Sequence, residues 1–251
     1  MSSSAAVKKI NELIKAKEYK KAVDACDIER MKGNGSPSIL YLHGVAFYNL
    51  ENISKAKECF QAVLQQSPNH LNSLRYMVEV SGKENQMGEA LKYQNRIVEM
   101  KKAEHSPDLF KEYRKLMKLN DTMGAEKEVI NTLRTILSLP DLPAESRRGA
   151  IAKLSENLKF ISCNSLEDIQ LIYDVLSSLK ETGSRSLCSH DGLALIQRAY
   201  LHIIHACIAN PTNTECPTFL HSFDVLLSNT PAAFVLAECQ LAVAHTDRFF
   251  L

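Results

Sequence analysis

The stretch from Pro37 to His70 reads PSILYLHGVAFYNLENISKAKECFQAVLQQSPNH, and it decides the fold. Apolar residues recur in each half of it at three- and four-residue intervals, the spacing of one helix face. A proline suits the first turn of a helix, and the residue before Pro68 avoids the α conformation. The stretch is therefore predicted to form two helices, over 37–50 and 54–66, joined by a short turn.

The same pattern recurs along the first half of the chain. Ala22, Ala56 and Ala90 each stand early in a second helix and are 34 residues apart, and one further step reaches Gly124. Small residues at every step of one period indicate an internal repeat. The sequence thus predicts four helix–turn–helix copies, over 3–36, 37–70, 71–104 and 106–139.

These units resemble the tetratricopeptide repeat, a family of 34-residue helix hairpins. The copy at 37–70 matches the signature spacings of the family best, although Leu40 stands where the family usually has Trp and His43 stands at its leucine position. The first and third copies match fewer positions. In the fourth, a shift of one residue brings Leu109, Leu116, Ala125 and Val129 to signature sites. The repeat signature as a whole comprises Ala22, Gly44, Phe47, Ala56, Phe60, Pro68 and Ala90.

The resemblance implies an all-α, right-handed α-solenoid with a concave face built from the first helix of each hairpin. In such a stack, Gly44 and Ala56 are small where two helices approach closely, and Phe47 and Phe60 fill the gap to the neighbouring hairpin, because no hairpin buries that face alone. Residues 1–140 are expected to form the four repeats.

Helical patterning continues through residues 141–251, although the period fades. Stripes of apolar residues and helix-stop signals predict further helices. We interpret this half as degenerate repeats with a C-terminal cap, and a separate helical bundle is the alternative. The expected helices cover 144–161, 166–181, 192–209, 217–228 and 232–245.

The composition is that of a soluble globular protein. Apolar residues make up 45% and charged residues 24%, which excludes a disordered chain. The formal net charge is only +1, so no global field favours nucleic acid or anionic lipid. Glycine and proline are too scarce for an all-β fold.

Seven cysteines are scattered without a CxxC pair, which favours reduced thiols in the cytoplasm, with the nucleus as an alternative. No secretory signal and no transmembrane helix is expected, and no membrane partner follows from the sequence.

Two clusters could carry chemistry. Cys188-Ser-His190-Asp191 combines a thiol, an imidazole and a carboxylate, but adjacency in sequence is not the geometry of a catalytic pair. His202, His205, Cys207, Cys216 and His221 could suggest zinc, but they lack a compact ligand pair. No phosphate-binding glycine loop is present. We therefore expect no catalytic residue, no metal and no cofactor.

The groove implied by the resemblance is the informative site. Its predicted lining runs from apolar and tyrosine-rich to basic, which suits a protein or peptide partner with apolar or aromatic anchors followed by acidic residues. The alternative interpretation is that the tyrosines pack between hairpins and the cations form a solvated face. The predicted groove residues are Asn11, Tyr41, Val45, Tyr48, Arg75, Tyr76, Lys111, Arg114, Lys115 and Lys118.

One class of partner is not expected. Tetratricopeptide co-chaperones of the heat-shock type clamp a C-terminal carboxylate with a set of Lys, Asn and Arg residues. Here only Asn11 matches that set, and Val7, Leu42, Asn72 and Tyr76 occupy the other positions. A desolvated carboxylate would be left without its cations, which is costly.

The sequence thus predicts a non-catalytic adaptor or scaffold subunit that mediates protein–protein interaction, as part of a larger complex. The alternative is an RNA-binding helical repeat that uses the basic stripe from Lys111 to Lys118, with Lys101, Lys102, Arg147 and Arg148 nearby.

Overall fold

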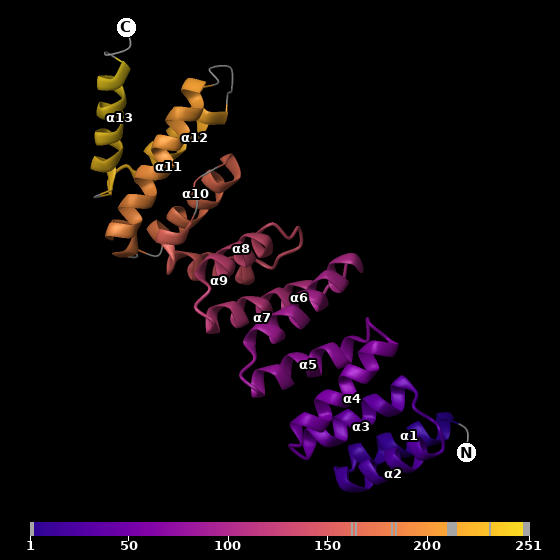
Figure 1. The fold of residues 1–251 in the computed structure, drawn as a ribbon. Coiled ribbons are helices and arrows are strands. Elements are labelled where there is room, and N and C mark those ends of the chain that lie inside the picture. The colour runs from indigo at the N-terminus through magenta and orange to yellow at the C-terminus, as the bar shows by residue number, and fades with distance from the viewer. Residues whose placement is uncertain are drawn as a thin grey trace. The chain divides into compact units, whose positions relative to one another are not determined.

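The computed structural model describes residues 3–161, 163, 165–181, 183, 185–209, 215–230 and 232–247, and every regular element within them is a helix. The chain divides into two compact units, Met1–Met123 and Gly124–Leu251 (Figure 1). This division falls before the boundary at residue 140 that the sequence suggested. The two units are therefore described separately.

Unit 1 contains three complete helix hairpins and a seventh helix. The first helices begin at residues 3, 37 and 71, and the second helices at 19, 53 and 87, so both series keep the 34-residue period. The fold of these three hairpins is tetratricopeptide-like. The helices are α1 (Ser3–Lys15), α2 (Tyr19–Met31), α3 (Pro37–Asn49), α4 (Ile53–Gln66), α5 (Leu71–Lys83), α6 (Met87–Ala103) and α7 (Leu109–Thr122).

The turn inside each hairpin repeats with the same period. Lys17, Glu51 and Asn85 are 34 residues apart and have positive φ angles of 61°, 59° and 58°. In each turn the next N–H donates to the carbonyl five residues earlier, at 2.8–3.0 Å, which closes the helix in a Schellman motif. The repeat is thus present in backbone geometry as well as in side-chain pattern.

The buried core of unit 1 lies between consecutive hairpins. Ala22, Ala56 and Ala90 are fully buried, as the repeat predicted. One apolar cluster joins the first hairpin to the second, and another joins the second to the third, so the hairpins form a stack of the α-solenoid type. The first cluster comprises Ile10, Ala22, Cys26, Ile39, Leu42 and Ala46, and the second comprises Val45, Phe47, Ala56, Cys59, Phe60, Met77 and Val80.

Gly44 is where the helices of the second hairpin approach most closely. A Cβ atom built on Gly44 would lie 2.7 Å from one carbon of the Phe60 ring and 3.0 Å from two others. The Phe60 ring also stacks on Tyr76 of the third hairpin, with centroids 4.7 Å apart and planes 10° apart. Phe60 therefore packs against Gly44 within its own hairpin and against Tyr76 in the next one.

The fourth repeat departs from the period. A strict register would start its helices at 105 and 121, whereas α7 begins at Leu109 and α8 (Glu126–Leu137) at Glu126. Leu116 and Val129 are buried, as the shifted alignment predicted. The two helices belong to different compact units, so the fourth repeat over 106–139 stays a prediction.

Unit 2 is organised around a central helix, α11 (His190–Ala209), and its helix starts do not follow the 34-residue period. The Tyr200 hydroxyl donates to Asp224 at 3.0 Å and accepts from Gln240 at 2.6 Å, which ties α11 to α12 and α13. The bounds of α10 agree with the sequence prediction. The other elements are α8, α9 (Ala144–Ser155), η1 (Leu158–Phe160), α10 (Leu166–Glu181), η2 (Arg185–Cys188), α12 (Glu215–Leu227) and α13 (Ala233–Asp247).

By length and composition alone, α11 could cross a membrane, and it is the one such helix among the described residues. One face of it, including Leu195, Ile196, Ala199 and Ile203, is buried within unit 2, whereas Ile208 is 56% exposed. A core helix of a folded domain has the same composition.

Substituting Gly44 by alanine tests the close approach to Phe60. We expect Gly44→Ala to lower the free energy of unfolding by about 1–3 kcal/mol, because Phe60 is held by Tyr76 and cannot move aside. Gly82→Ala on α5 is the matched control, because a Cβ there meets nothing within 4 Å. That change should stabilise by about 0.5–1 kcal/mol through helix propensity. Urea unfolding followed by circular dichroism measures both, and equal effects would contradict the packing described.

Candidate functional site

The first helices of unit 1 lie side by side. α1 packs on α3, Tyr48 of α3 contacts Tyr76 of α5, and Arg75 of α5 reaches Glu112 of α7. We call the surface formed by the ten predicted groove residues, Asn11 to Lys118, the first-helix face. Residues on the remaining helices, α2, α4 and α6, form the second-helix layer.

The three tyrosines of this face form one aromatic cluster. Tyr76 lies at its centre, with Tyr48 5.1 Å away in an edge-to-face arrangement and Tyr41 6.0 Å away. The Tyr41 ring also lies 5.1 Å from the ring of His70. All three tyrosines are partly buried, so each packs between hairpins and still presents an edge to solvent. The tyrosines therefore pack between hairpins, as the alternative interpretation expected, and their role in binding a partner stays a prediction.

Tyr48 has polar partners as well. Its hydroxyl donates to Glu79 Oε2 at 2.8 Å, and Lys83 Nζ lies 4.2 Å from the ring centroid. Burial, followed by the bond to Glu79, raises the pKa of Tyr48 to about 12. The hydroxyl therefore stays protonated and remains a donor at neutral pH.

The two other residues predicted at this end of the face differ in exposure. Asn11 is exposed on α1. Val45 is only 7% exposed and belongs to the cluster between the second and third hairpins. Val45 therefore packs beneath the first-helix face and offers little surface to a partner.

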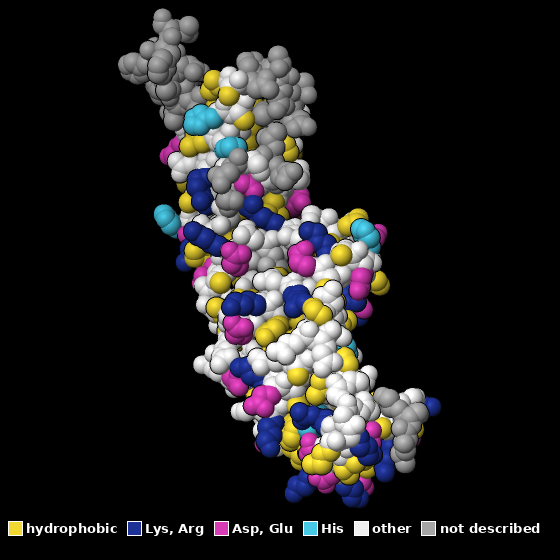
Figure 2. All heavy atoms as spheres, turned by 45° about the vertical axis from the view of Figure 1, so that its right-hand side comes forward, with side chains coloured by type: hydrophobic (Ala, Val, Ile, Leu, Met, Phe, Trp, Pro, Cys, Tyr) yellow, Lys and Arg dark blue, Asp and Glu magenta, His cyan; other side chains and the backbone are white. Residues whose placement is uncertain are grey.

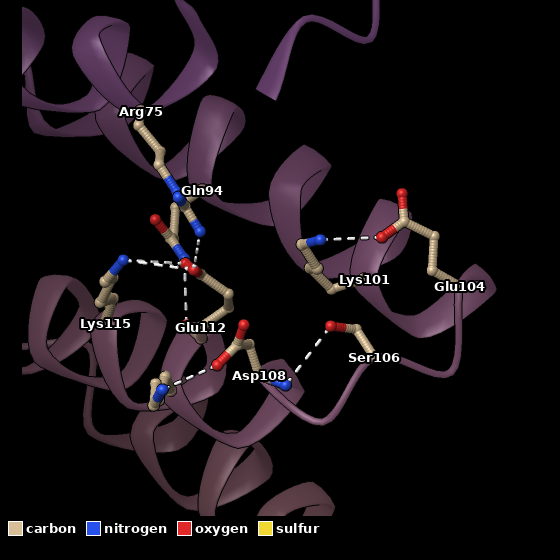
Figure 3. A network of polar contacts seen from close by, with 9 residues as sticks. Arg75, Gln94, Lys101, Glu104, Ser106, Asp108, Glu112 and Lys115 are labelled. Atoms are coloured by element: carbon tan, nitrogen blue, oxygen red, sulfur yellow. Dashed lines mark hydrogen bonds and ion pairs between the residues drawn. The ribbon is translucent and has the colours of Figure 1, made fainter. Parts of the chain in front are cut away.

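The basic end of the face is built on a buried carboxylate. Glu112 is 1% exposed and accepts from Arg75 Nη2 at 2.9 Å, from Gln94 Nε2 at 3.1 Å and from Lys115 Nζ at 3.2 Å (Figure 3). Gln94 also donates to the Glu112 carbonyl at 3.0 Å. The carboxylate thus joins α5, α6 and α7.

The pKa of Glu112 is lowered by this arrangement. Burial acts to raise it, but the hydrogen bonds from Gln94, Lys115 and Arg75 together outweigh that effect. Glu112 is therefore charged at neutral pH, and its charge is matched by two cations that remain partly exposed.

The other cations of the stripe have different partners. Lys111 pairs with Asp108 at 2.7 Å, and the Arg114 guanidinium lies 5.8 Å from the centroid of the Phe110 ring. Lys118 has no ion pair within the described part of unit 1. Figure 2 shows cationic and anionic side chains interspersed on the face in view.

Sequence reasoning missed the residues that organise the face from within. Glu112 reads as one more exposed acid on a charged helix, and Gln94 occupies a second-helix position with no distinguishing pattern. Their burial appears only when α5, α6 and α7 are packed, and so do the contacts of Glu112 with Lys115 and Arg75, which are three and thirty-seven residues away in sequence. No signal in the sequence distinguishes Glu112 from the exposed acids around it.

Two histidines of the second hairpin are also shielded from solvent, His43 fully and His70 in part. His43 is 1% exposed, and neither ring nitrogen has a hydrogen bond; the nearest acid, Asp27 of the first hairpin, lies 3.5 Å from Nε2. Burial lowers the pKa of His43 most, Asp27 acts to raise it, and Arg30 and Lys55 lower it further. His70 is the N-cap of α5, and its Nδ1 accepts from the Ser73 N–H at 3.2 Å. Burial lowers its pKa too.

The residues of the two clusters considered for chemistry are spread over η2, α11 and α12. Within the described residues, no three His, Cys, Asp or Glu side chains are placed to hold a metal. Cys188 ends η2 and His190 begins α11, with Ser189 Oγ accepting from the Gly192 N–H at 3.1 Å in a helix-capping role. His205 and His221 are exposed, His202 and Cys207 are partly buried, and the side chain of Cys216 lies outside the described residues.

Two cavities lie away from the first-helix face. One of about 390 Å³ lies at the α1–α2 turn beside Leu50. The other, of about 400 Å³, lies among α8, α9 and α10 of unit 2, next to the ion pair between Arg134 and Asp168. Charges of both signs line each of them.

Comparison with known proteins adds a distant likeness. No family model matches the sequence, and no curated protein matches it. Similar solved structures include Naa15/Naa10 bound to HypK-THB, at 16% identity over 84% of this chain and 32% of that chain, with a TM-score of 0.42. The apo form of the quorum sensor NprR from B. thuringiensis is 11% identical over 93% of this chain and 68% of that chain, with a TM-score of 0.43.

A third similar structure is the C-terminal part of a TPR repeat-containing protein from Cytophaga hutchinsonii. It is 12% identical over 85% of this chain and 99% of that chain, with a TM-score of 0.36. The present chain spans about a third of the Naa15/Naa10 structure it matches. All three scores lie below 0.5, so the tetratricopeptide-like assignment rests on the helix and turn register of unit 1.

Replacing the buried carboxylate should destabilise the α5–α7 region. We expect Glu112→Gln to lower the free energy of opening these helices by about 2 kcal/mol at pH 7, because hydrogen bonds to a charged group are lost. The pKa of Glu112 is lower folded than unfolded, so its contribution is complete above about pH 4.5 and disappears as the pH falls through the folded value. The difference in opening free energy between Glu112→Gln and the wild type should therefore shrink as the pH falls through the folded pKa.

Hydrogen exchange of the α5–α7 amides in the full chain measures this effect. Glu89→Gln is the control, because Glu89 forms an ion pair with Lys92 within α6 whose side chains are 44% and 74% exposed. It should change the opening free energy by less than about 0.5 kcal/mol. A Glu112→Gln effect no larger than the control would show that the buried network is not formed.

The buried histidines predict a loss of stability in mild acid. The unfolded chain takes up protons near pH 6.5, whereas folded His43 and His70 resist protonation, so stability is full above about pH 6.5 and falls as the pH drops towards the lower folded values. We expect His43→Leu to stabilise unit 1 by about 1 kcal/mol at neutral pH, since it removes an unsatisfied buried group. It should also reduce the acid sensitivity.

Thermal unfolding between pH 7 and pH 5 tests the role of His43. His221→Leu, at an exposed position of unit 2, is the control and should leave the pH dependence of the unfolding temperature unchanged. If His43→Leu leaves the acid sensitivity unchanged, groups other than His43 cause the loss of stability.

Proposed function

We propose that the protein is a non-catalytic adaptor or scaffold subunit that binds a partner polypeptide on the first-helix face of unit 1. The observation that carries this proposal is the composition of that face. Partly exposed tyrosines on α3 and α5 adjoin partly exposed cations on α5 and α7, and both sets rest on a fixed, well-packed layer. Tyrosine and arginine are the residue types enriched at the energetic centres of protein interfaces.

The partner is a protein segment with apolar or aromatic side chains followed by acidic ones. The tyrosine end suits the former, and the α5–α7 end suits the latter by charge complementarity. The C-terminal tails of heat-shock chaperones do not fit, because Val7, Leu42, Asn72 and Tyr76 occupy the positions where a carboxylate clamp needs polar or cationic groups. Membership of a larger complex and a cytoplasmic location, where the free cysteines would stay reduced, belong to the same proposal.

The RNA-binding alternative has less support. Lys111 is paired with Asp108, and Lys115 shares the single charge of Glu112 with Arg75, so part of the positive charge of the stripe is already offset within the protein. Phosphate binding by a neutral protein needs several free cations on one surface. Salt-dependent retention of RNA on a filter, lost on charge reversal at Arg114 and Lys118, would favour the RNA alternative.

Site-specific photocrosslinking tests the proposed face without disturbing its packing. Alanine substitution of the tyrosines is unsuitable, because they also hold the hairpins together. We expect a photoreactive residue at Ser38 or Asn72, both exposed on first helices, to give the same discrete adduct in cells. The matched controls are Gln61 and Asn95, exposed on the second-helix layer, which should give none.

Adducts are separated by size and identified by mass spectrometry. Discrete adducts from Gln61 and Asn95 alone would move the interaction to the second-helix layer and contradict the proposal. Crosslinks to RNA in place of protein would favour the alternative.

A further inference from the structure

We propose that Arg75 and Lys115 form an anion-binding subsite for a side-chain carboxylate in an acidic segment of the partner. The inference rests on the proposed function and specifies where the acidic part of the partner binds. It concerns two residues, one on α5 and one on α7, that meet only in the folded protein.

The subsite is held in place from below. Arg75 Nη2 and Lys115 Nζ bind the same carboxylate at 2.9 and 3.2 Å, and Glu112 itself is fixed by two hydrogen bonds from Gln94 (Figure 3). The two cationic side chains are 39% and 53% exposed, whereas the Glu112 side chain is 2% exposed. The carboxylate therefore occupies the inner side of the pair, and solvent reaches the outer side.

Donors remain for a second anion. A guanidinium has five N–H groups and an ammonium has three. Glu112 engages Arg75 through Nη2, and no hydrogen bond of Arg75 Nη1 is present within the described residues. Two cations already restrained by a buried carboxylate lose less conformational entropy on binding a ligand than two free side chains do.

The local charge favours an acidic ligand. Helices α5 and α7, together with the α7 N-cap Asp108, carry six cations and four carboxylates, whereas the predicted lining of α1 and α3 contains no charged residue. A partner segment would therefore place its acidic part here and its apolar part against the tyrosines. The cations are Arg75, Lys83, Lys111, Arg114, Lys115 and Lys118, and the carboxylates are Glu79, Asp108, Glu112 and Asp121.

The ligand is a series of side-chain carboxylates along a peptide and not a terminal carboxylate or a phosphate. The positions of the terminal-carboxylate clamp, such as Asn72 and Tyr76, carry no charge. Lys111, Lys115 and Lys118 follow one another along α7 at about one turn, roughly 5 Å, which matches carboxylates spaced along a chain. Phosphate recognition relies on converging arginines, and Arg114 is stacked near Phe110.

Fluorescence anisotropy on the full chain tests the subsite with a labelled peptide of sequence EEFEEFEE and its neutral counterpart QQFQQFQQ. We expect the acidic peptide to bind at least about tenfold more tightly than the neutral one. The double variant Arg75→Gln/Lys115→Gln should lose about tenfold in affinity for the acidic peptide and little for the neutral one.

Two further variants keep the test decisive. Lys21→Gln/Lys92→Gln removes the same charge from exposed positions on α2 and α6 and should change the affinity less than about threefold. Removal of both cations leaves the buried Glu112 carboxylate without its ion-pair partners. The triple variant Arg75→Gln/Lys115→Gln/Glu112→Gln is therefore compared with Glu112→Gln alone. The triple variant should bind about tenfold more weakly than that background, with an unchanged circular dichroism spectrum.

The outcomes separate this inference from the proposed function. Equal binding of the two peptides, or equal loss in both double variants, would overturn the subsite; the proposed function would stand if crosslinking from Ser38 and Asn72 succeeds. No binding of either peptide would also overturn the subsite. A peptide with phosphoserine in place of glutamate that binds tenfold more tightly would show that the ligand is a phosphate.

Discussion

The structure of unit 1 depends on the position of one aromatic ring. Phe60 lies against the Cα of Gly44 in its own hairpin and stacks on Tyr76 in the next hairpin. The first contact requires a residue without Cβ, because the ring approaches to a distance that no side chain tolerates. The second contact fixes how the third hairpin packs on the second. The close approach within one hairpin and the stacking between hairpins are thus coupled through a single side chain, which explains why the best-matching repeat, 37–70, lies in the middle of the stack.

The same packing creates the candidate site. Tyr76 stacks on Phe60 and meets Tyr48 and Tyr41 edge to face, so the tyrosines exposed on the first-helix face are the outer part of the inter-hairpin core. At the other end of the face, the buried Glu112 replaces apolar packing with ion pairs and hydrogen bonds between α5, α6 and α7. A buried carboxylate is tolerated only when its charge is matched, and the matching groups are the cations that the face presents. Stability and the proposed binding chemistry therefore use the same residues.

Much of the fold could be predicted from the sequence because its signals are local. The 34-residue period, the small residues and the prolines place the helices of residues 3–104, and stop signals define α10 to the residue. The break after α7 could not be predicted in this way, since Leu116 and Val129 keep their spacing and are buried although the two helices belong to different units. The site was predictable in its exposed residues but not in their supports. Glu112 and Gln94 act through partners far away in sequence, and the cap formed by His70 uses a residue type that helix N-termini rarely carry.

A double-mutant cycle on Phe60 and Tyr76 tests most directly whether the hairpins stack in register through this ring. Each residue is changed to leucine singly and together, and the free energy of unfolding is measured in urea for all four proteins. Stacked aromatic pairs contribute about 0.5–1.5 kcal/mol beyond the area they bury, so we predict a coupling of about 1 kcal/mol. A coupling near zero, with the two single changes simply additive, would mean that the second and third hairpins do not pack on each other through Phe60, and the account of both the fold and the first-helix face would fail.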